Sequence, residues 1–315
     1  MNVLLHVAWL PCALLGALPA NAGAAVPVPE PEEPLFAIPT QLDRIGRILA
    51  PVLINGQGPF RLIIDTGANH STISPQLAHT LGLVPSAEHQ RRVNGVTGSA
   101  WVPTVIVDRI EAGLFVVEGA SVPVIGSSMT AEADGILGVA GLKYARIIVD
   151  FRRDRVSITR SRLHDDPTDF LTIEGRRMAD GVLAVDAFVR GVRARAIIDT
   201  GAERTLGNLA LRDALRARRG TTGTARWTDV FGATPEISRG ESLLARSVQL
   251  GDVTVNYVDI TYGDFPIFKS WGLDARPALL IGMDVLGVAD TLIIDFRQNQ
   301  VRVRRSQQES VVHLN

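Results

Sequence analysis

The chain has 315 residues, 46% of them hydrophobic and 21% charged, with a formal net charge of −1 at pH 7 and an isoelectric point near 6.6. A chain of this size and composition can form two hydrophobic cores. Its near-neutral charge gives no reason to propose nucleic acid or an anionic membrane surface as a partner.

The first 22 residues have the features of a signal peptide. An apolar run over residues 3–18 is followed by Pro19-Ala20-Asn21-Ala22, which fits a signal peptidase site of the A-x-A kind, although no Lys or Arg precedes the run. We therefore predict export to the periplasm or the exterior, with an uncleaved membrane anchor as the alternative. The only cysteine, Cys12, lies in this leader, so the mature chain contains no disulfide, cysteine nucleophile or cysteine-bound zinc.

Residues 23–40 are expected to be a Pro-rich linker. Between residues 26 and 34 proline alternates with Val and Glu, which favours an extended, solvated chain. The sequence leaves open whether this stretch is also an inhibitory pro-segment.

A first lobe is expected over residues 41–160. Its strands are short and rich in Val and Ile, and the turn pairs Asn55-Gly56 and Asn94-Gly95 are typical of type I′ hairpins. One helix is predicted between them, with Ser74 as N-cap, Pro75 in the first turn and Gly82 after its end.

Residues 161–170 are polar and rich in turn formers, so we place the connection between lobes there. A second lobe follows over 171–305, with one helix over 208–218, and 306–315 is expected to be a frayed tail. The fold class predicted is all-β, mostly strands with one short helix per lobe.

The second lobe repeats the first. Asp-Thr-Gly-Ala occurs at residues 65–68 and again 134 residues later at 199–202, each time after two isoleucines. At the same offset, Ser74 is answered by Asn208 in the predicted N-cap position. Residues 148–152 recur as 293–297, with the offset grown to 145 as loop insertions would produce. We interpret this long period as two duplicated lobes.

The repeated tetrapeptide suits a pair of cooperating carboxylates. The isoleucines anchor a strand in a core, the glycine allows a sharp turn, and the aspartate is left at the rim. Lobes related by a pseudo-twofold axis would bring Asp65 and Asp199 to one seam, where two like charges share a proton. One carboxylate can then activate a water molecule while the other donates to a substrate carbonyl. No cofactor is expected for this chemistry.

These residues resemble those of the aspartic proteases, and Ala68 and Ala202 after Asp-Thr-Gly make the chain most similar to retropepsin-like members. The resemblance covers nearly all of residues 40–305 and includes Ile136-Leu137-Gly138 and Leu280-Ile281-Gly282, triplets that thread behind the catalytic loops in that family. It implies a bilobal acid-protease fold in which two retropepsin-like lobes are joined in one chain, as in pepsins. It further implies an aspartic-type endopeptidase that acts on polypeptides and needs no partner subunit, so that a monomer suffices.

The resemblance also assigns roles to residues of both lobes. Asp65 and Asp199 are implied to be catalytic, and the hydroxyl groups of Thr66 and Thr200 to bond across the seam. The supporting positions of the two loops are Gly67, Ala68, Gly201 and Ala202.

Two flaps are implied by glycine-containing segments at 93–98 and 230–233, with tips at Gly95, Val96, Gly232 and Ala233. The flap tyrosine of pepsins has no counterpart in either segment. Trp101 and Trp227, which flank the flaps, are expected to be packing residues, with stacking on the substrate as the alternative.

Residues just beyond each tetrapeptide should line opposite sides of the substrate cleft. These are Asn69 and His70 in one lobe and Glu203 and Arg204 in the other, and their different charges predict asymmetric subsites. Pepsins have Ser or Thr where this chain has Ala68 and Ala202, and that hydroxyl can donate a hydrogen bond to the ionised carboxylate. Because losing this donor raises the pKa of each aspartate, we expect a weakly acidic to near-neutral pH optimum.

The same residues are compatible with other interpretations. A single Asp-Thr-Gly is most often a strand-to-turn junction, and the duplicated scaffold could be a peptide-binding or assembly module that does not cleave. An enzyme acting on another acyl substrate is weaker, because no Ser-His-Asp set with an elbow motif is present. The remaining histidines lack ligand spacing, so no metal is predicted. Four aspartates beside apolar runs are expected to be turn or cap acceptors, namely Asp134, Asp150, Asp284 and Asp295.

Overall fold

The computed structural model describes residues 38–39, 41–42, 46–112, 115–126, 133–162, 169–218 and 225–304. The predicted signal peptide and tail lie outside the described residues, as do most of the predicted linker and residues 163–168 of the inter-lobe connection. In the described part of the chain, no helix is long and apolar enough to cross a membrane.

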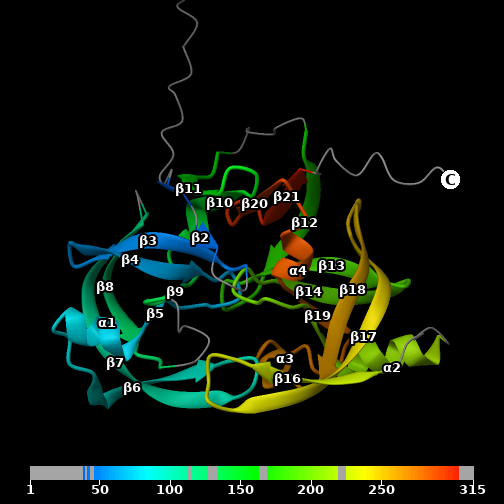
Figure 1. Cartoon of the computed structure of the whole chain (residues 1–315), viewed down its shortest axis with the longest axis horizontal. Helices are drawn as coiled ribbons and strands as arrows, with labels where there is room; N and C mark the ends of the chain where they lie inside the picture. Colours follow the sequence, from blue (N-terminus) through cyan, green and yellow to red (C-terminus); the bar gives the residue numbers. More distant parts are fainter. Residues whose placement is uncertain are drawn as a thin grey trace, which may run out of the picture. The chain divides into compact units, whose positions relative to one another are not determined.

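Strands dominate, which confirms the predicted fold class (Figure 1). The first half forms an eight-stranded sheet whose main path runs β5-β9-β4-β3-β7-β6, with β2 paired to β3 and β8 to β7. Its strands are β2 (Gln41–Leu42), β3 (Ile48–Ile54), β4 (Gln57–Ile64), β5 (Thr72–Ile73), β6 (Ser86–Asn94), β7 (Ser99–Ala112), β8 (Phe115–Pro123) and β9 (Gly135–Leu137).

The second half repeats this arrangement within a thirteen-stranded sheet. Its strand β14 pairs in parallel with β19, as β4 pairs in parallel with β9 in the first half. The strands of this part are β13 (Leu183–Val189), β14 (Val192–Ile198), β15 (Leu206–Asn208), β16 (Arg226–Phe231), β17 (Ile237–Leu250), β18 (Val253–Gly263) and β19 (Ala278–Ile281).

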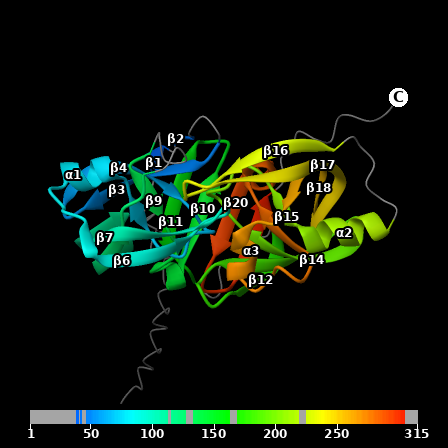
Figure 2. The same ribbon diagram turned by 90° about the horizontal axis from the view of Figure 1, so that it is seen from below.

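Strands from both halves build the rest of this large sheet, in the order β1-β11-β10-β20-β21-β12. At its centre lie β10 and β20, which end with the first three residues of the repeat at 148–152 and 293–297 and pair antiparallel with Ile148 opposite Ile293. Seen from below, the remaining strands of the two halves lie on either side of β10 and β20 (Figure 2). These strands are β1 (Ile38–Pro39, within the predicted linker), β10 (Ala145–Asp150), β11 (Arg155–Arg160), β12 (Leu171–Arg177), β20 (Thr291–Asp295) and β21 (Gln300–Arg304).

Both predicted helices are present with the expected caps. Helix α1 (Pro75–Thr80) begins after Ser74, whose side chain accepts from the N–H of Leu77 at 3.0 Å, and α2 (Leu209–Ala217) begins after Asn208. One helix per lobe is wrong for the second lobe, which adds α3 (Pro266–Ser270) and α4 (Met283–Leu286). The first lobe also has one short 3₁₀ turn, η2 (Leu142–Tyr144). These elements have five residues or fewer, too few to show a helical period.

The two predicted hairpin turns have different outcomes. Asn55 and Gly56 have φ of 51° and 73°, as a type I′ turn requires. The prediction at Asn94-Gly95 is wrong, because Asn94 is the last residue of β6 and pairs with Ser99. Four residues, 95–98, form the loop, which is closed by a 2.8 Å hydrogen bond from the N–H of Gly95 to the carbonyl of Gly98.

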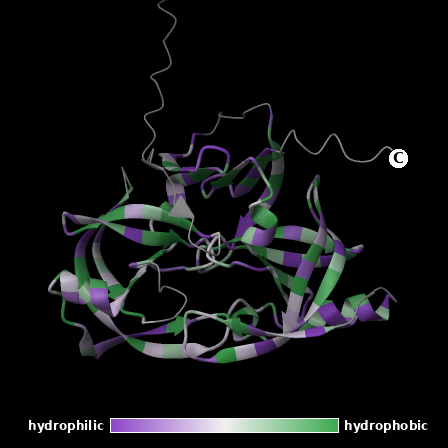
Figure 3. Cartoon of the chain, in the orientation of Figure 1, coloured by the Kyte–Doolittle hydropathy of each residue, from purple (hydrophilic) through white to green (hydrophobic). Residues whose placement is uncertain are grey.

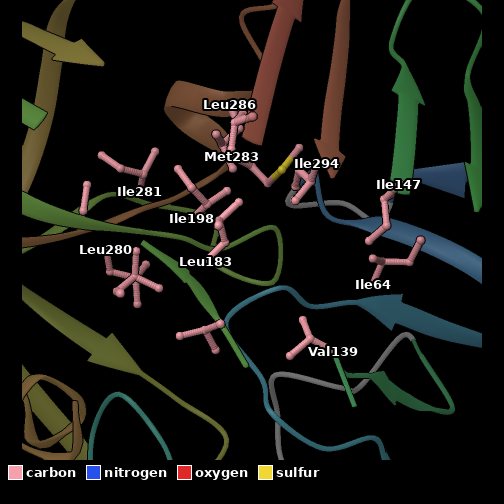
Figure 4. Close-up of a cluster of buried hydrophobic side chains, with 14 of the residues drawn as sticks. Ile64, Val139, Ile147, Leu183, Ile198, Leu280, Ile281, Met283, Leu286 and Ile294 are labelled. Carbon is pink, nitrogen blue, oxygen red and sulfur yellow. The ribbon is translucent and has the colours of Figure 1, made fainter. Parts of the chain in front are cut away.

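The isoleucines before each tetrapeptide are buried, as predicted, at 1% exposure or less. Ile64 and Ile198 belong to an apolar cluster that also includes Leu183, Val139 and Met283 (Figure 4), and apolar residues recur along the strands of both halves (Figure 3). The strand ends that carry the two aspartates are therefore held by cores of Val, Ile and Leu side chains.

The cap residue Asn208 connects the start of α2 to the segment before β19 through its side-chain hydrogen bonds. Its amide nitrogen donates to the carbonyls of Leu273 and Arg276 at 2.7 and 2.6 Å, and its oxygen accepts from the N–H groups of Leu211 and Ala278. Asn208→Ala leaves these buried groups unpaired, so we expect the free energy of unfolding to fall by about 3 kcal/mol or more. Ser74→Ala removes a cap alone and should cost about 1 kcal/mol. Urea unfolding of both variants checks this, and equal losses would contradict it.

Candidate active site

The two tetrapeptides begin where β4 and β14 end, beside the parallel strands β9 and β19. The N–H of Asp65 donates to the carbonyl of Leu137 at 3.1 Å, and that of Asp199 to the carbonyl of Ile281 at 3.0 Å. The triplets that contain Leu137 and Ile281 thus lie directly behind the tetrapeptides, as the resemblance implied. Matching bonds in the two halves hold the two aspartates in matching frames.

Thr66 and Thr200 cross-link the two loops. The hydroxyl of Thr66 donates to the carbonyl of Ile198 at 2.7 Å and accepts from the N–H of Thr200 at 3.1 Å. The hydroxyl of Thr200 donates to the carbonyl of Ile64 at 2.6 Å and accepts from the N–H of Thr66 at 3.2 Å. Both threonines are fully buried, so each lobe satisfies polar groups of the other that water does not reach.

The carboxyl groups of Asp65 and Asp199 lie in contact at this seam. They are hydrogen-bonded to each other, and a Cβ atom on Gly67 or Gly201 would overlap the carboxyl group of the opposite lobe. Only glycine at these positions leaves room for the pair. In addition, Oδ1 of each aspartate accepts two N–H groups of its own loop. The donors are Gly67 and Ala68, both 2.9 Å from Asp65, and Gly201 and Ala202, 2.9 and 3.2 Å from Asp199.

The two aspartates differ in their proton affinity. Burial raises the pKa of Asp199 well above its ordinary value, and the nearby charge of Asp65 raises it further. Burial also raises the pKa of Asp65, but hydrogen bonds from Asp199, Gly67 and Ala68 and the positive charge of Arg47 lower it in part. Asp199 is 7% exposed and Asp65 is only partly buried. The pair therefore retains one shared proton at pH values where an isolated aspartate is ionised.

Two hairpins close toward each other at the predicted flaps. Their strands are β6 with β7 and β16 with β17, near the lower side of Figure 1. The hydroxyl groups of Thr97 and Thr234, each 5% exposed, lie 3.2 Å apart. Gly95 of the first tip lies against the Ala233-Thr234 backbone of the second. The predicted tip residues Gly95 and Ala233 are thus brought together.

The predicted wall residues follow directly on each tetrapeptide. Asn69 and His70 are exposed, and partial desolvation of the His70 imidazole together with the charge of Arg91 lowers the pKa of His70. Glu203 is paired with Arg204 at 3.4 Å in the other lobe. The two sides of the seam therefore present different polar groups, an amide and an imidazole on one side and an ion pair on the other.

Some residues around the site were missed. Ser71 and Thr205 accept from the N–H groups of Gly138 and Gly282, each at 3.2 Å, and they lie 134 residues apart, so the repeat offset could have found them. Thr97 and Thr234 could have been found at the flap offset of 137. Arg47, which is 5% exposed, has no counterpart in the repeat.

The remaining side chains singled out in the sequence lie in varied surroundings. The expectation of turn or cap acceptors is confirmed for Asp150 and Asp295, which accept the N–H groups two and three residues further on. It is wrong for Asp134 and Asp284, which accept from the distant N–H groups of Arg61 and Thr205. The packing role expected for Trp101 and Trp227 is wrong, since they are 68% and 61% exposed. Among the described residues, no three His, Cys, Asp or Glu side chains are grouped as metal ligands would be.

Comparison with known proteins agrees with this geometry. A model of the aspartyl protease family matches the chain twice, over residues 50–140 and 185–285. The chain belongs to the aspartyl protease family. Each match covers one Asp-Thr-Gly-Ala loop, so this aspartyl protease family member consists of two retropepsin-like lobes in a single chain. No curated protein matches the chain in a sequence search.

The shared proton makes the stability of this aspartyl protease depend on pH. Because the folded state raises the pKa of both aspartates, ionising them destabilises the fold as pH rises through those pKa values, and the cost is absent below the unfolded value near 3.9. Asp199→Asn keeps the shape and cannot ionise. We expect its free energy of unfolding, relative to the wild type, to increase by about 1 kcal/mol or more between pH 4 and pH 8. Urea unfolding checks this, with exposed Asp108→Asn as the matched control, and a flat difference would contradict it.

Proposed function

We propose that this protein is an aspartic endopeptidase that hydrolyses peptide bonds with a water molecule activated between Asp65 and Asp199. The observation that carries the proposal is the hydrogen bond between these two carboxyl groups, one from each lobe, in a site where burial raises the pKa of both. Paired carboxyl groups that share one proton can supply a base and an acid at once. Membership of the aspartyl protease family supports the same chemistry.

The charge of Arg47, which favours the ionised form of Asp65, is the basis on which we assign the two roles. Asp65, as the carboxylate, takes a proton from the water as its oxygen attacks the substrate carbonyl carbon. Asp199 gives its proton to the carbonyl oxygen, which produces a neutral tetrahedral diol. The carboxyl groups then reverse roles: Asp65 protonates the leaving amine and Asp199 takes a proton from the diol as the C–N bond breaks. The site returns to one shared proton.

The N–H groups of each loop keep the carboxyl groups in place through this cycle. Each aspartate has two such donors at 2.9 to 3.2 Å. Since these donors are backbone groups fixed by the Thr66 and Thr200 bonds, little reorganisation is needed when charge moves between the carboxyl groups. A module that only bound peptides would need neither the shared proton nor its fixed donors, which favours the enzyme over the binding module.

The proposal extends to place and assembly. Both aspartates come from one chain, so we propose that a monomer is active. Residues 1–22 support action after export, and fractionation of cells that express the full chain tests this.

Cleavage of a diverse peptide mixture is the direct test. The wild type should cleave, and Asp65→Asn and Asp199→Asn should each lower kcat/KM by at least about 10³-fold, because each removes one half of the acid-base pair. Pepstatin, an inhibitor of aspartic proteases, should block the wild type. Products are identified by mass spectrometry, with Asp108→Asn as a control that stays active. Equal cleavage by the aspartate variants would leave only the binding module.

The pH dependence of kcat/KM tests the assigned roles. The rate should rise with pH as Asp65 loses its proton and fall as Asp199 loses its own, which gives a bell-shaped profile. Because the pKa of each aspartate is raised, the maximum should lie at weakly acidic to near-neutral pH. A maximum below about pH 3 would contradict the assignment.

A further inference from the structure

A hollow of about 240 Å³ opens beside the candidate active site, between the two halves of the chain. Asn69 and His70 line it from the first half, and Arg177, Asp180 and Gly181 from the turn between β12 and β13 in the second. One water molecule in liquid occupies about 30 Å³, so the hollow has room for a side chain. Gly181 lies 134 residues after Arg47 and is therefore its equivalent in the second half. Because glycine has no side chain, the space that a buried arginine fills in the first half is open here.

Two cations face this hollow, and the described residues give neither of them a carboxylate within ion-pair distance. The guanidinium group of Arg177 lies 5.8 Å from the centre of the Phe296 ring. Its Nε has no hydrogen-bond partner among the described residues, and Nη2 makes one long bond, 3.3 Å, to the carbonyl of Lys143. Burial lowers the pKa of Arg177, with the charge of Asp295 as a partial offset. Lys143, the second cation, is exposed over the ring of Tyr144.

The carboxylate of Asp180, which also lines the hollow, is held by a neighbour. Its Oδ2 accepts from the indole N–H of Trp271 at 2.9 Å, and Oδ1 faces the N–H of Val182 at 3.5 Å. With Lys143 and Arg177 against Asp180, the lining has a net positive charge, and Arg91 adds a further positive charge beside His70. On the other side of the seam, Arg204 is already paired with Glu203.

The hollow lies within reach of a peptide bound at the dyad. His70 is five residues from Asp65, and an extended chain of five residues spans at most about 18 Å. Val139 and Ala140, which also line the hollow, are attached to the loop that follows Asp65. Their N–H groups donate to the carbonyls of Ala68 and Asn69. A side chain in the hollow therefore belongs to a residue within about five positions of the bond at the dyad.

We propose that this hollow binds a carboxylate of the substrate through Arg177 and Lys143, so that the protein selects peptides with an acidic group on one side of the cleaved bond. The inference rests on the proposed peptidase function and names the substrate class of that site. The carboxylate can come from a Glu or Asp side chain or from the C-terminus of a peptide. In either case its negative charge faces the guanidinium group of Arg177 and the ammonium group of Lys143, which line the hollow without a carboxylate of their own among the described residues.

The test compares matched peptides. Starting from a peptide that the wild type cleaves, Glu and Gln are placed in turn at each of the five positions on either side of the cleaved bond, and C-terminal acids are compared with amides. We expect Glu to exceed Gln in kcat/KM by about tenfold at one position on one side only, or the acid to exceed the amide if a terminus is the ligand. The Glu:Gln ratio should fall about threefold in Lys143→Gln and about tenfold in Arg177→Gln. In Lys143→Glu a Lys peptide should become favoured over a Glu peptide.

Controls separate the hollow from net charge and from folding. Arg176→Gln, on the exposed face of β12, and Lys269→Gln, at the only other lysine, remove the same charge elsewhere and should leave the ratio unchanged. Lys143 is exposed, so its variants decide the matter if Arg177→Gln fails to fold. A ratio near one in the wild type, or one that none of the hollow variants changes, overturns the inference while cleavage itself upholds the peptidase.

Binding provides a readout that does not depend on cleavage. Fluorescent Glu and Gln peptides are titrated against Asp65→Asn, alone and combined with the hollow variants, and Kd is measured by anisotropy. If the wild type cleaves nothing, the proposed function fails, and the Kd ratio still upholds or overturns the carboxylate site. The expected result is tighter binding of the Glu peptide that Lys143→Gln weakens about threefold.

Discussion

The crossed hydrogen bonds of Thr66 and Thr200 are the constraint on which the site depends. Each hydroxyl satisfies one carbonyl and one N–H of the opposite loop, at distances between 2.6 and 3.2 Å, and no water competes because both residues are fully buried. A typical hydrogen bond adds only about 1 kcal/mol, but leaving such buried groups unpaired costs more, so separating the loops is strongly disfavoured. The arrangement holds two carboxyl groups together that would repel each other if both were ionised. The proton that the pair retains removes this repulsion, and the proposed chemistry uses the same proton.

Much of this arrangement could be predicted because the sequence of the first lobe is repeated in the second. The tetrapeptides, the caps Ser74 and Asn208 and the hydrophobic-Gly triplets each recur, and a repeated local pattern is strong evidence for a repeated structure. The errors fall where a neighbour far along the chain decides. Asn94-Gly95 has the residues of a tight turn, yet the tip that it belongs to meets Ala233 and Thr234, and a four-residue loop forms instead. The exposure of Trp101 and Trp227 likewise depends on whether another part of the chain packs against their face of the flap strands, which no local pattern reveals.

The hollow beside His70 was beyond the reach of sequence reasoning for a related reason. It exists because one half has Arg47 and the other Gly181 at the equivalent position, and a missing side chain matters only when the surrounding walls are known. Arg177 presents the same difficulty. It is one of many arginines in the chain, and its unpaired Nε and its place over Phe296 follow from the meeting of β12 with residues of both halves.

Joining the two halves in one chain allows differences that a symmetric dimer cannot have. The Glu236 carboxylate lies against Gly98 of the opposite flap, and a hydrogen bond from Thr234 lowers its pKa. At the flap offset of 137 the first flap has Ser99, so only one tip carries this charge. In a dimer of identical subunits the same glutamate would appear at both tips, where like charges would oppose closure. Arg47 is a second difference between the copies. It lies on one side of the dyad only, and its charge favours the ionised form of Asp65. The duplication thus supplies matched frames for the two carboxyl groups, and the differences between the copies place unequal charges around them.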